Sequence, residues 1–318
     1  MSKAAPRSGG GEKSAIVLTR NPYLYTVRKF ASACARRGWK CEVIDPFLCG
    51  ARIGAANGGG INYEGKPLSP DLVFNRLASL ASDYSVAIAA ELESRGSLVI
   101  NPAAPTDKYR NKYSALKRLE EAELRVPETA LVRVGQDINA AIDSLGGPPV
   151  VLKYVRGSQG LGVIFGESYD AVTSIIESLN LIQYDTVLQR YYPQAKELDL
   201  RILVLGGKAI AGARRVASAD DFRSNFHRGG MLYRYDIPDD IAEMAVRASD
   251  AMGLYFAGVD IIGGPDGPIV LEVNLSPGFE GMDQVHGRDI AEELCEWAAA
   301  QLEKRIGDNQ CPTPSSFR

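Results

Sequence analysis

Two carboxylates and an amide stand close together near the end of the chain, with Asp260 in one apolar stretch and Glu272 and Asn274 in the next. An antiparallel pairing around a turn at Pro265–Gly267 places Asp260 opposite Glu272. The two-residue period of a strand then puts Asn274 on the same face. Opposed carboxylates repel each other and are better tolerated with a cation between them. Carboxylate and amide oxygens are hard ligands, so the pattern predicts a magnesium site that also holds phosphate oxygens.

The other face of this hairpin is expected to be apolar and to belong to the core. Its members are Val259, Ile261, Leu271 and Val273. An ordinary solvated sheet face that carries two acids is the alternative. The sequence Ser276–Gly278 ends the second strand abruptly. Asn274 therefore lies at the mouth of a loop, where binding sites are common.

A glycine-rich loop between two predicted strands is the second candidate site. Gly157–Gly162 holds three glycines in six residues, and the N–H groups of such a loop can surround a phosphate. Lys153 lies in the apolar strand before it, where a buried lysine needs an anionic partner. A Walker A loop would lead into a helix through Gly-Lys-Ser/Thr, and a Rossmann fingerprint would not be followed by a strand. A plain glycine-rich hairpin turn is the alternative.

Arginines form the third candidate site. Asp199 and Arg201 share one face of a predicted strand, and Arg214 and Arg215 end the next strand. The segment Arg223–Gly230 carries two arginines, an asparagine and a histidine with almost no aliphatic residue. Such a segment can bind phosphate and carboxylate groups through bidentate arginine contacts. A solvated loop with ordinary ion pairs is the alternative, and it applies most to the Arg214-Arg215 pair.

The elements that must position these residues begin with alternating strands and helices. Predicted strands are 15–19, 40–44, 72–75 and 98–101, with a hairpin over 62–68 and helices that begin near residue 24 and span 82–94. This alternation predicts an α/β domain with an open, largely parallel sheet. After its first strand the chain reads Leu18–Tyr23, which lacks the Gly-x-Gly-x-x-Gly pattern of an NAD-dependent oxidoreductase.

A second domain is predicted to follow a boundary at Pro102 and Pro105. Asp107 is expected to cap a helix that runs to about Leu124. Further strands are predicted at 129–134, 150–155, 163–165, 186–191, 198–205, 208–216, 256–262 and 268–274, and helices at 137–145, 169–178, 239–252 and 289–304. The pair Gly206-Gly207 predicts a tight turn between two of these strands.

The composition is that of a globular protein and excludes several classes. The 318 residues are 45% hydrophobic and 24% charged, which suits about two domains rather than a disordered chain. The net charge of −3 argues against a general nucleic-acid binder but allows a local basic site. Five cysteines without a Cys-x-x-Cys pair and only two histidines argue against zinc and fit a reducing cytoplasm. No segment approaches the roughly 20 apolar residues of a membrane span, and Ala15–Leu18 is too short for a signal-peptide core.

In this order, these features resemble the ATP-grasp superfamily and, within it, the RimK family of amino-acid ligases. The resemblance covers about residues 14–305, and its most specific segments are Asn225–Gly230 and Glu272–Gly278. The chain departs from the family at Asn75–Ala78, where Pro-Arg-Ile-Gly is usual. That departure bears on the identity of the acceptor more than on the chemistry.

The resemblance implies an α/β fold of the α+β ATP-grasp type. A parallel α/β pre-ATP-grasp domain would span 14–105, and a two-part ATP-grasp domain would span 106–306 with a mobile lid at about 127–187. Independently of the resemblance, the composition of residues 1–13 and 307–318 predicts flexible ends.

By the same resemblance, many of the candidate residues would bind ATP. They are Lys112, Lys153, Gly157, Ser158, Gln159, Gly160, Gln189, Arg190, Tyr191, Asp199, Arg223 and Asn225. The two lysines would contact phosphates, and the glycine loop would be a flap over them. The stretch Gln189–Tyr191 would be a hinge whose backbone reads adenine, and Asp199 would hold the ribose hydroxyls or nearby ATP atoms.

The catalytic and metal-binding roles also follow from the resemblance. Arg201, Arg223 and Asn225 would act on the phosphates and the acyl phosphate. Two magnesium ions, with manganese as a substitute, would be bound by Asp260, Glu272 and Asn274, and Glu272 would bridge them.

The implied activity is an ATP-dependent ligation that forms an amide bond. A carboxylate would attack the γ-phosphate to give an acyl phosphate and ADP, and an amine would then attack the acyl carbon. The substrates would be L-glutamate and the C-terminal carboxylate of a protein or peptide such as a ribosomal protein, and poly-α-glutamate is a further product that the family makes. The enzyme would work in the cytoplasm as a homo-oligomer, without nucleic acid or membrane.

Two alternatives stay open. One is an ATP-grasp ligase that glutamylates a small cofactor of the pterin or deazaflavin type, or a carrier protein. The other is a nucleotide-binding regulatory protein without catalysis. Release of ADP that depends on both an amino acid and an acceptor distinguishes an enzyme from such a binder.

Overall fold

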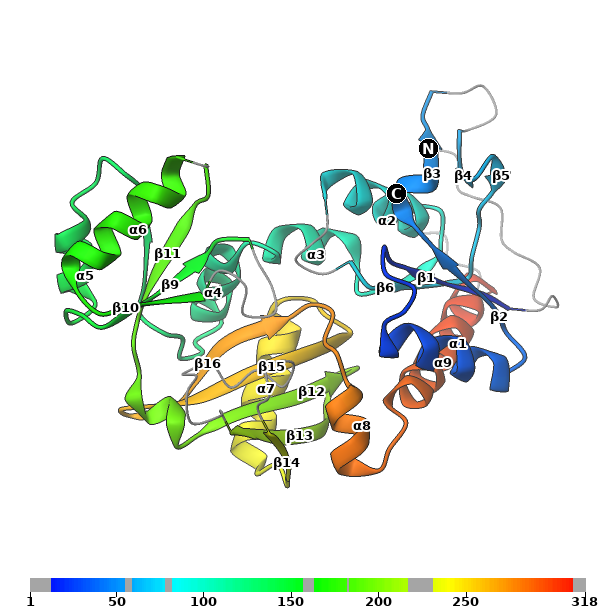
Figure 1. Cartoon of the computed structure of the whole chain (residues 1–318). Coiled ribbons are helices and arrows are strands. Elements are labelled where there is room, and N and C mark those ends of the chain that lie inside the picture. Colours follow the sequence, from blue (N-terminus) through cyan, green and yellow to red (C-terminus); the bar gives the residue numbers. More distant parts are fainter. Residues whose placement is uncertain are drawn as a thin grey trace, which may run out of the picture. The chain divides into compact units, whose positions relative to one another are not determined.

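The computed structural model describes residues 13–54, 59–77, 82–156, 163–181, 183–216 and 231–310. The chain divides into two compact units, and most of their helices and strands are labelled in Figure 1. The first unit comprises Met1–Leu77, Asp83–Ala103 and Arg288–Arg318, and the second comprises Ala78–Ser82 and Ala104–Gly287. Within the described ranges, no helix combines the length and the apolar character that crossing a lipid bilayer requires.

A four-stranded parallel sheet forms the centre of the first unit, which confirms the predicted α/β domain. Its strands, in spatial order, are β2 (Lys40–Ile44), β1 (Ser14–Leu18), β6 (Leu72–Asn75) and β7 (Leu98–Ile100). Helices α1 (Tyr25–Arg36) and α2 (Asp83–Ser94) belong to the connections between them. Strands β1 and β6 are apolar because they are buried on both faces. Phe30 of α1 stacks on Phe74 with ring centroids 4.2 Å apart.

A small antiparallel sheet lies between β2 and β6 in the sequence. Its strands are β3 (Cys49–Arg52), β4 (Gly60–Tyr63) and β5 (Lys66–Pro67), and the 3-10 helix η1 (Pro46–Leu48) precedes them. The hairpin predicted around Glu64-Gly65 is confirmed, and Gly65 has the positive φ of 79° that this turn requires. The sequence did not predict β3, because Cys49–Arg52 carries no β-branched or aromatic residue.

The last helix, α9 (Ile290–Gln310), belongs to the first unit, whereas the sequence-based domain boundaries counted it with the second domain. Asp289, just before this helix, forms ion pairs of 2.9 Å with Lys29 and with Arg36 of α1. The fully buried side chains of α9 are Ile290, Ala291, Leu294, Cys295 and Ala298. A helical pattern predicts such an apolar face but does not show which sheet the face covers.

The cysteines of the first unit are free thiols in the part of the chain that the structure describes. Cys34 of α1 contacts Cys295 of α9 and Cys41 of β2. The hydrogen bond with Cys295, together with burial, raises the pKa of Cys34 to about 12. A thiol with so high a pKa is a poor nucleophile, so Cys34 is no candidate for covalent catalysis.

Two short helices open the second unit, where the sequence predicted one. Helix α3 (Ala103–Tyr109) ends before Asn111, and Asn111 caps α4 (Lys112–Glu121) by accepting a hydrogen bond from the Ser114 N–H at 3.0 Å. The prediction that Asp107 caps the helix is wrong, because Asp107 lies inside α3. Pro105 is tolerated there because it lies in the first turn, where an N–H has no partner within the helix.

The second unit contains two sheets. The smaller has the spatial order β10 (Val163–Gly166), β9 (Val150–Tyr154), β11 (Thr186–Arg190) and β8 (Thr129–Val132). Helices α5 (Ile138–Ser144) and α6 (Tyr169–Leu181) cover one of its faces, and their buried residues share one core with the strands. The helices and strands were predicted close to these bounds.

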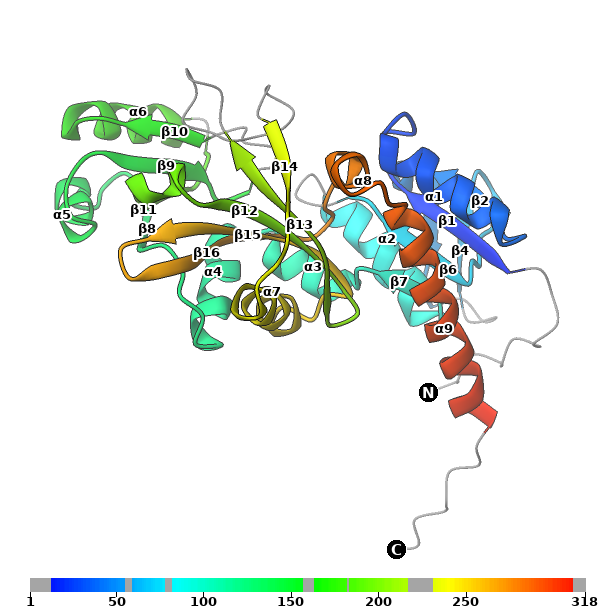
Figure 2. The ribbon, with the colours of Figure 1, turned by 90° about the horizontal axis from the view of Figure 1, so that it is seen from below.

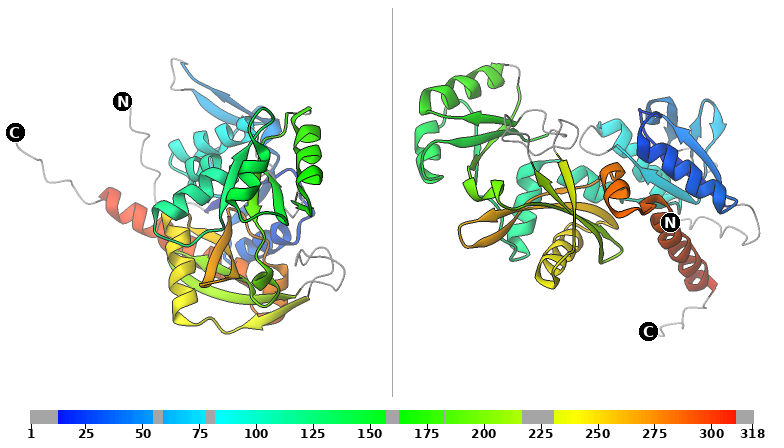
Figure 3. Two further views of the ribbon diagram at one scale, coloured as in Figure 1. Left: turned by 90° about the vertical axis from the view of Figure 1, so that its left-hand side faces the viewer. Right: turned by 60° about the horizontal axis from the view of Figure 1, so that its bottom comes forward.

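The larger sheet has five antiparallel strands. Their spatial order is β14 (Met231–Tyr235), β13 (Lys208–Val216), β12 (Asp199–Leu205), β15 (Phe256–Gly264) and β16 (Gly267–Asn274). Helices α4 and α7 (Asp239–Ala251) pack on one face, and the views in Figures 2 and 3 place α7 there. The 3-10 helix η3 (Pro193–Lys196) leads into the sheet, and α8 (Glu280–His286) follows it. The opposite face of the sheet carries the candidate site.

Candidate active site

The hairpin of β15 and β16 pairs the two carboxylates as predicted. Asp260 is the Cα partner of Glu272, and Gly258 is the partner of Asn274. The Asn274 amide nitrogen lies 3.4 Å from Oδ2 of Asp260 and 3.5 Å from Oε1 of Glu272. A side chain at Gly258 would collide with Pro277, because its Cβ would lie 2.8 Å from the Pro277 Cβ. The close approach of strand and loop therefore requires this glycine.

A β-bulge changes the face that was predicted for Leu271. The register shifts after Asp260, so that Ile261 pairs with Val270 and Leu271 is the extra residue. Val270 is fully buried in the core under the sheet. Leu271 instead packs against a small cluster that contains Tyr192. The prediction of an apolar core face is confirmed for Val259, Ile261 and Val273 and wrong for Leu271.

Arg201 holds the Asp260 carboxylate from the neighbouring strand. The two residues are Cα partners on β12 and β15. Arg201 Nε donates to Oδ1 and Nη2 donates to Oδ2 of Asp260, both at 2.7 Å. Asp260 is only 1% exposed, and burial alone would raise its pKa. Arg201 and Arg215 more than offset this effect and lower the pKa of Asp260 to about 2.

Arg215 joins the same network, and the sequence had not singled it out from Arg214. Its Nε donates to Oδ1 of Asp199 at 2.7 Å, and its Nη1 donates to Oδ2 of Asp260 at 3.0 Å. Arg214 is exposed and donates to the Glu197 carbonyl at 2.7 Å. The two arginines therefore serve opposite faces of β13.

Asp199 is nearly buried beside this network. Burial raises its pKa to about 6, Arg215 opposes the shift, and the nearby Asp260 carboxylate adds to it. An acid with this pKa is ionised at neutral pH. An ionised carboxylate only accepts hydrogen bonds, so Asp199 can accept them from Arg215 and also from hydroxyl groups of a ligand.

Two lysines approach the carboxylates from α4 and β9. The Lys112 Nζ lies 3.6 Å from Oε2 of Glu272. The Lys112 N–H also donates to the Val155 carbonyl at 2.9 Å, which fixes the start of α4 beside the end of β9. Lys153 is 8% exposed, and burial lowers its pKa to about 8 against the attraction of Glu272. The lysines in turn hold the pKa of Glu272 below its ordinary value, although burial opposes this.

The predicted hinge lies at the end of β11, and its side chains bind neighbours. Gln189 donates to Thr129 Oγ1 at 3.0 Å. Arg190 pairs with Glu128 at 2.9 Å, and Tyr191 contacts Phe165 edge to face. The Arg190 N–H donates to the Glu128 carbonyl at 3.0 Å, and the role of the hinge in reading adenine stays a prediction. The predicted residues Gly157, Ser158, Gln159, Gly160, Arg223 and Asn225 lie outside the described residues.

The donor set fits magnesium rather than zinc. No group of three or more His, Cys, Asp or Glu side chains suited to a metal occurs among the residues with described positions. The candidate site offers two carboxylates and one amide, so phosphate oxygens or water would complete the coordination. Glu272 is the more accessible acid, with 36% of its side chain exposed. Asp260 would have to exchange an arginine contact, and Asn274 would have to turn its amide oxygen toward the ion.

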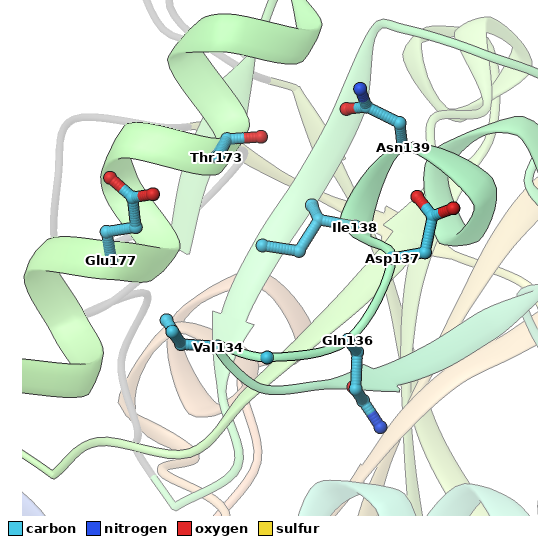
Figure 4. Close-up of a pocket in the computed structure, with 8 residues that line it drawn as sticks. Val134, Gln136, Asp137, Ile138, Asn139, Thr173 and Glu177 are labelled. Carbon is cyan, nitrogen blue, oxygen red and sulfur yellow. The ribbon is translucent and has the colours of Figure 1, made fainter.

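A pocket beside the smaller sheet of the second unit is a poorer candidate for the active site. Figure 4 shows it between the 134–139 segment and α6. Two of its polar side chains already serve local structure. Asp137 caps α5 by accepting from the Ala140 N–H at 3.0 Å, and Gln136 accepts from the Arg133 N–H at 2.9 Å. None of the predicted site residues lines this pocket.

Comparison with known proteins gives matches over most of the chain. Residues 14–105 match the RimK PreATP-grasp domain, and residues 109–298 match the RimK-like ATP-grasp domain. A probable alpha-L-glutamate ligase of Citrobacter koseri is 36% identical over 88% of this chain and 94% of its own length. The ribosomal protein bS6–L-glutamate ligase of Salmonella paratyphi B is 35% identical over the same shares. A RimK domain ATP-grasp protein of Sphaerobacter thermophilus has a similar fold, with a TM-score of 0.71 and 23% identity over 90% of this chain and 98% of that one.

Proposed function

The chain belongs to the RimK-like ATP-grasp family and is an ATP-dependent ligase that forms carbon–nitrogen bonds, and we propose that it joins L-glutamate to the C-terminal carboxylate of a protein or peptide. The observation that carries the proposal is one sheet face on which Asp260, Glu272 and Asn274 lie beside Lys112 and Lys153. Carboxylates for a cation and lysines for phosphates are what phosphoryl transfer to a carboxylate requires.

The reaction has two steps. An oxygen of the acceptor carboxylate forms a bond to the γ-phosphorus while the bond between that phosphorus and ADP breaks. The amine of glutamate then attacks the acyl carbon of the resulting acyl phosphate, and phosphate and a proton leave. Water would hydrolyse this intermediate, so a closing lid is needed, and we assign that role to residues 127–187.

The residues of the chain act mainly by charge and orientation. Lys112 and Lys153 neutralise phosphate charge, and Asp199 binds the ribose. Arg201 holds Asp260 in place and offers positive charge to the acyl phosphate. Arg223, Asn225 and the 157–162 loop are assigned to the phosphates by resemblance. Magnesium, as two ions or with manganese instead, would be held by Asp260, Glu272 and Asn274 and would neutralise the transferring phosphoryl group.

The substrates are inferred from the names of relatives about 35% identical to this chain. One is named for ribosomal protein bS6 and L-glutamate, and another is named an alpha-L-glutamate ligase. We therefore infer a protein or peptide acceptor. A homo-oligomeric enzyme is proposed on the resemblance to the family alone. The departure at Asn75–Ala78 leaves the acceptor to be identified by experiment.

Mass spectrometry tests the proposal. Candidate acceptors, including ribosomal protein bS6 and a pterin-type cofactor, are incubated with the chain, ATP, magnesium and each amino acid in turn. The expected result is an acceptor heavier by one or more glutamyl groups, with one ADP released per group. ADP release without any amino acid, or no gain in acceptor mass with any amino acid, would contradict a carboxylate–amine ligase.

Glu272→Gln is the matched test of the site. The amide keeps the size of the side chain but loses the charge that would hold a cation, so amide formation should fall by more than a hundredfold. The far-ultraviolet circular dichroism spectrum should not change. A fully active Glu272→Gln variant would contradict the metal assignment.

A further inference from the structure

One buried guanidinium connects the acid assigned to the nucleotide with an acid assigned to the metal. Arg215 is 8% exposed and donates to Asp199 at 2.7 Å and to Asp260 at 3.0 Å. The proposed function gives Arg215 no contact with substrate. Its two contacts nevertheless span β13, β12 and β15, which are consecutive strands of one sheet.

We propose that Arg215 is a positioning residue that couples nucleotide binding at Asp199 to metal binding at Asp260. The inference rests on the proposed function for these two acids. A planar guanidinium holds two carboxylates in fixed directions at once, which a single-point cation cannot do. Without Arg215, two nearly buried carboxylates would face each other and repel.

Arg201 has a different task in the same network. Both of its hydrogen bonds across the strand pair go to Asp260, one to each oxygen. It therefore orients one acid, whereas Arg215 divides its bonds between two. Arg215 shares Oδ2 of Asp260 with Arg201, and this oxygen also lies 3.4 Å from the Asn274 amide.

The shared oxygen explains how the two binding events become linked. A cation at Asp260 must replace part of the arginine contact on that carboxylate. A nucleotide that fixes Asp199 also fixes Arg215, and the direction of Asp260 is then set before the cation arrives. By linkage, magnesium must raise nucleotide affinity by the same factor by which nucleotide raises magnesium affinity.

Calorimetry measures this coupling without catalysis. The dissociation constant of ADP is determined with and without magnesium, and the ratio of the two constants is the coupling factor. Arg215→Met should lower the coupling factor at least fivefold. Arg214→Met is the matched control, because Arg214 is the adjacent arginine, is itself exposed and points to the other face of β13, and its coupling factor should equal that of the unaltered chain. Equal ADP weakening with and without magnesium in Arg215→Met would show a merely structural role and overturn the inference.

Further variants keep the test decisive. If Arg215→Met does not fold, Arg215→Lys is compared with Arg214→Lys. Only Arg215→Lys should lose coupling, because a lysine ammonium lacks the planar guanidinium that holds two carboxylates at once. Adding Asp199→Asn to Arg215→Met should restore the fold by removing one of two mutually repelling charges, but not the coupling. If the unaltered chain binds no ADP, the proposed function fails and the inference with it. If it binds ADP but magnesium has the same effect in Arg215→Met, only the inference fails.

Discussion

At the residue scale, the candidate site concentrates charge of both signs in a small volume. Three carboxylates face four cations, and these side chains are Asp199, Asp260, Glu272, Lys112, Lys153, Arg201 and Arg215. Burying such charges costs stability unless each is paired. The local excess of cations suits a polyanion such as ATP in a chain whose net charge is −3. Binding, more than stability, explains this arrangement.

The stability cost of burying a charged side chain can be measured at Lys153. Burial lowers its pKa to about 8 in the folded chain from 10.5. The unfolded chain therefore binds more protons between these values, and folding becomes more favourable as pH rises through them. Below pH 8 the charged lysine should destabilise the fold by roughly 3 kcal/mol, since each pKa unit corresponds to about 1.4 kcal/mol.

Lys153→Met should therefore be more stable than the unaltered chain at pH 7 without nucleotide. The difference should shrink steadily between pH 8 and pH 10.5. Urea unfolding followed by circular dichroism measures it, and Lys117→Met, an exposed lysine on α4, is the control with no such trend. A stability difference that does not change with pH would contradict the lowered pKa.

At the element scale, β-bulges decide which side chains reach the site. Gly206-Gly207 predicts the hairpin of β12 and β13 correctly, and counting from it pairs Asp199 with Arg214. The bulge after Leu203 shifts the register by one residue, so that Leu200 pairs with Arg214 and Arg215 joins the face of Asp199. In the hairpin of β15 and β16 the loop predicted at Pro265–Gly267 is one residue too long, because Gly264 pairs with Gly267. The bulge at Leu271 offsets this difference, so that Asp260 still pairs with Glu272. Sequence periodicity carries no signal for an inserted residue, because packing on both faces selects it.

Gly258 is the element-scale position most sensitive to substitution. A methyl group there would lie 2.8 Å from the Pro277 Cβ and 3.5 Å from the Asn274 Cβ, so strand and loop must separate. Gly258→Ala should destabilise the second unit by about 1–3 kcal/mol and displace Asn274. Gly278→Ala is the control, since a Cβ at Gly278 meets nothing within 4 Å. Thermal unfolding and ADP titration with magnesium check both, and equal behaviour of the two variants would contradict the steric argument.

At the scale of the whole molecule, the two ends of the chain belong to the same compact unit. The first unit contains residues 1–77 and 83–103 and then α9 from the end of the chain, while every described residue of the candidate site lies in the second unit. The sequence indicates two domains and a boundary near Pro105, because composition and prolines mark it. It does not assign α9, since the contact of Cys295 and Asp289 with α1 depends on tertiary packing.

This division predicts that stability of the first unit and nucleotide binding respond to different substitutions. Leu294 of α9 is fully buried, and Leu294→Ala should cost the first unit about 2–5 kcal/mol. Trp39 and Trp297 are the two tryptophans of the chain and both belong to the first unit, so their fluorescence in urea reports its unfolding.

The affinity for ADP with magnesium, measured at a temperature where Leu294→Ala is still folded, should stay within twofold of the unaltered chain. Glu303→Ala is the matched control on the same helix, because 72% of its side chain is exposed, and it should change neither quantity. A large loss of ADP affinity in folded Leu294→Ala would show that α9 supports the nucleotide site directly. Unchanged tryptophan unfolding would instead show that α9 is not part of the core of the first unit. Tryptophan unfolding and ADP affinity, measured on the same variant, therefore test separately whether α9 stabilises the first unit and whether it supports nucleotide binding.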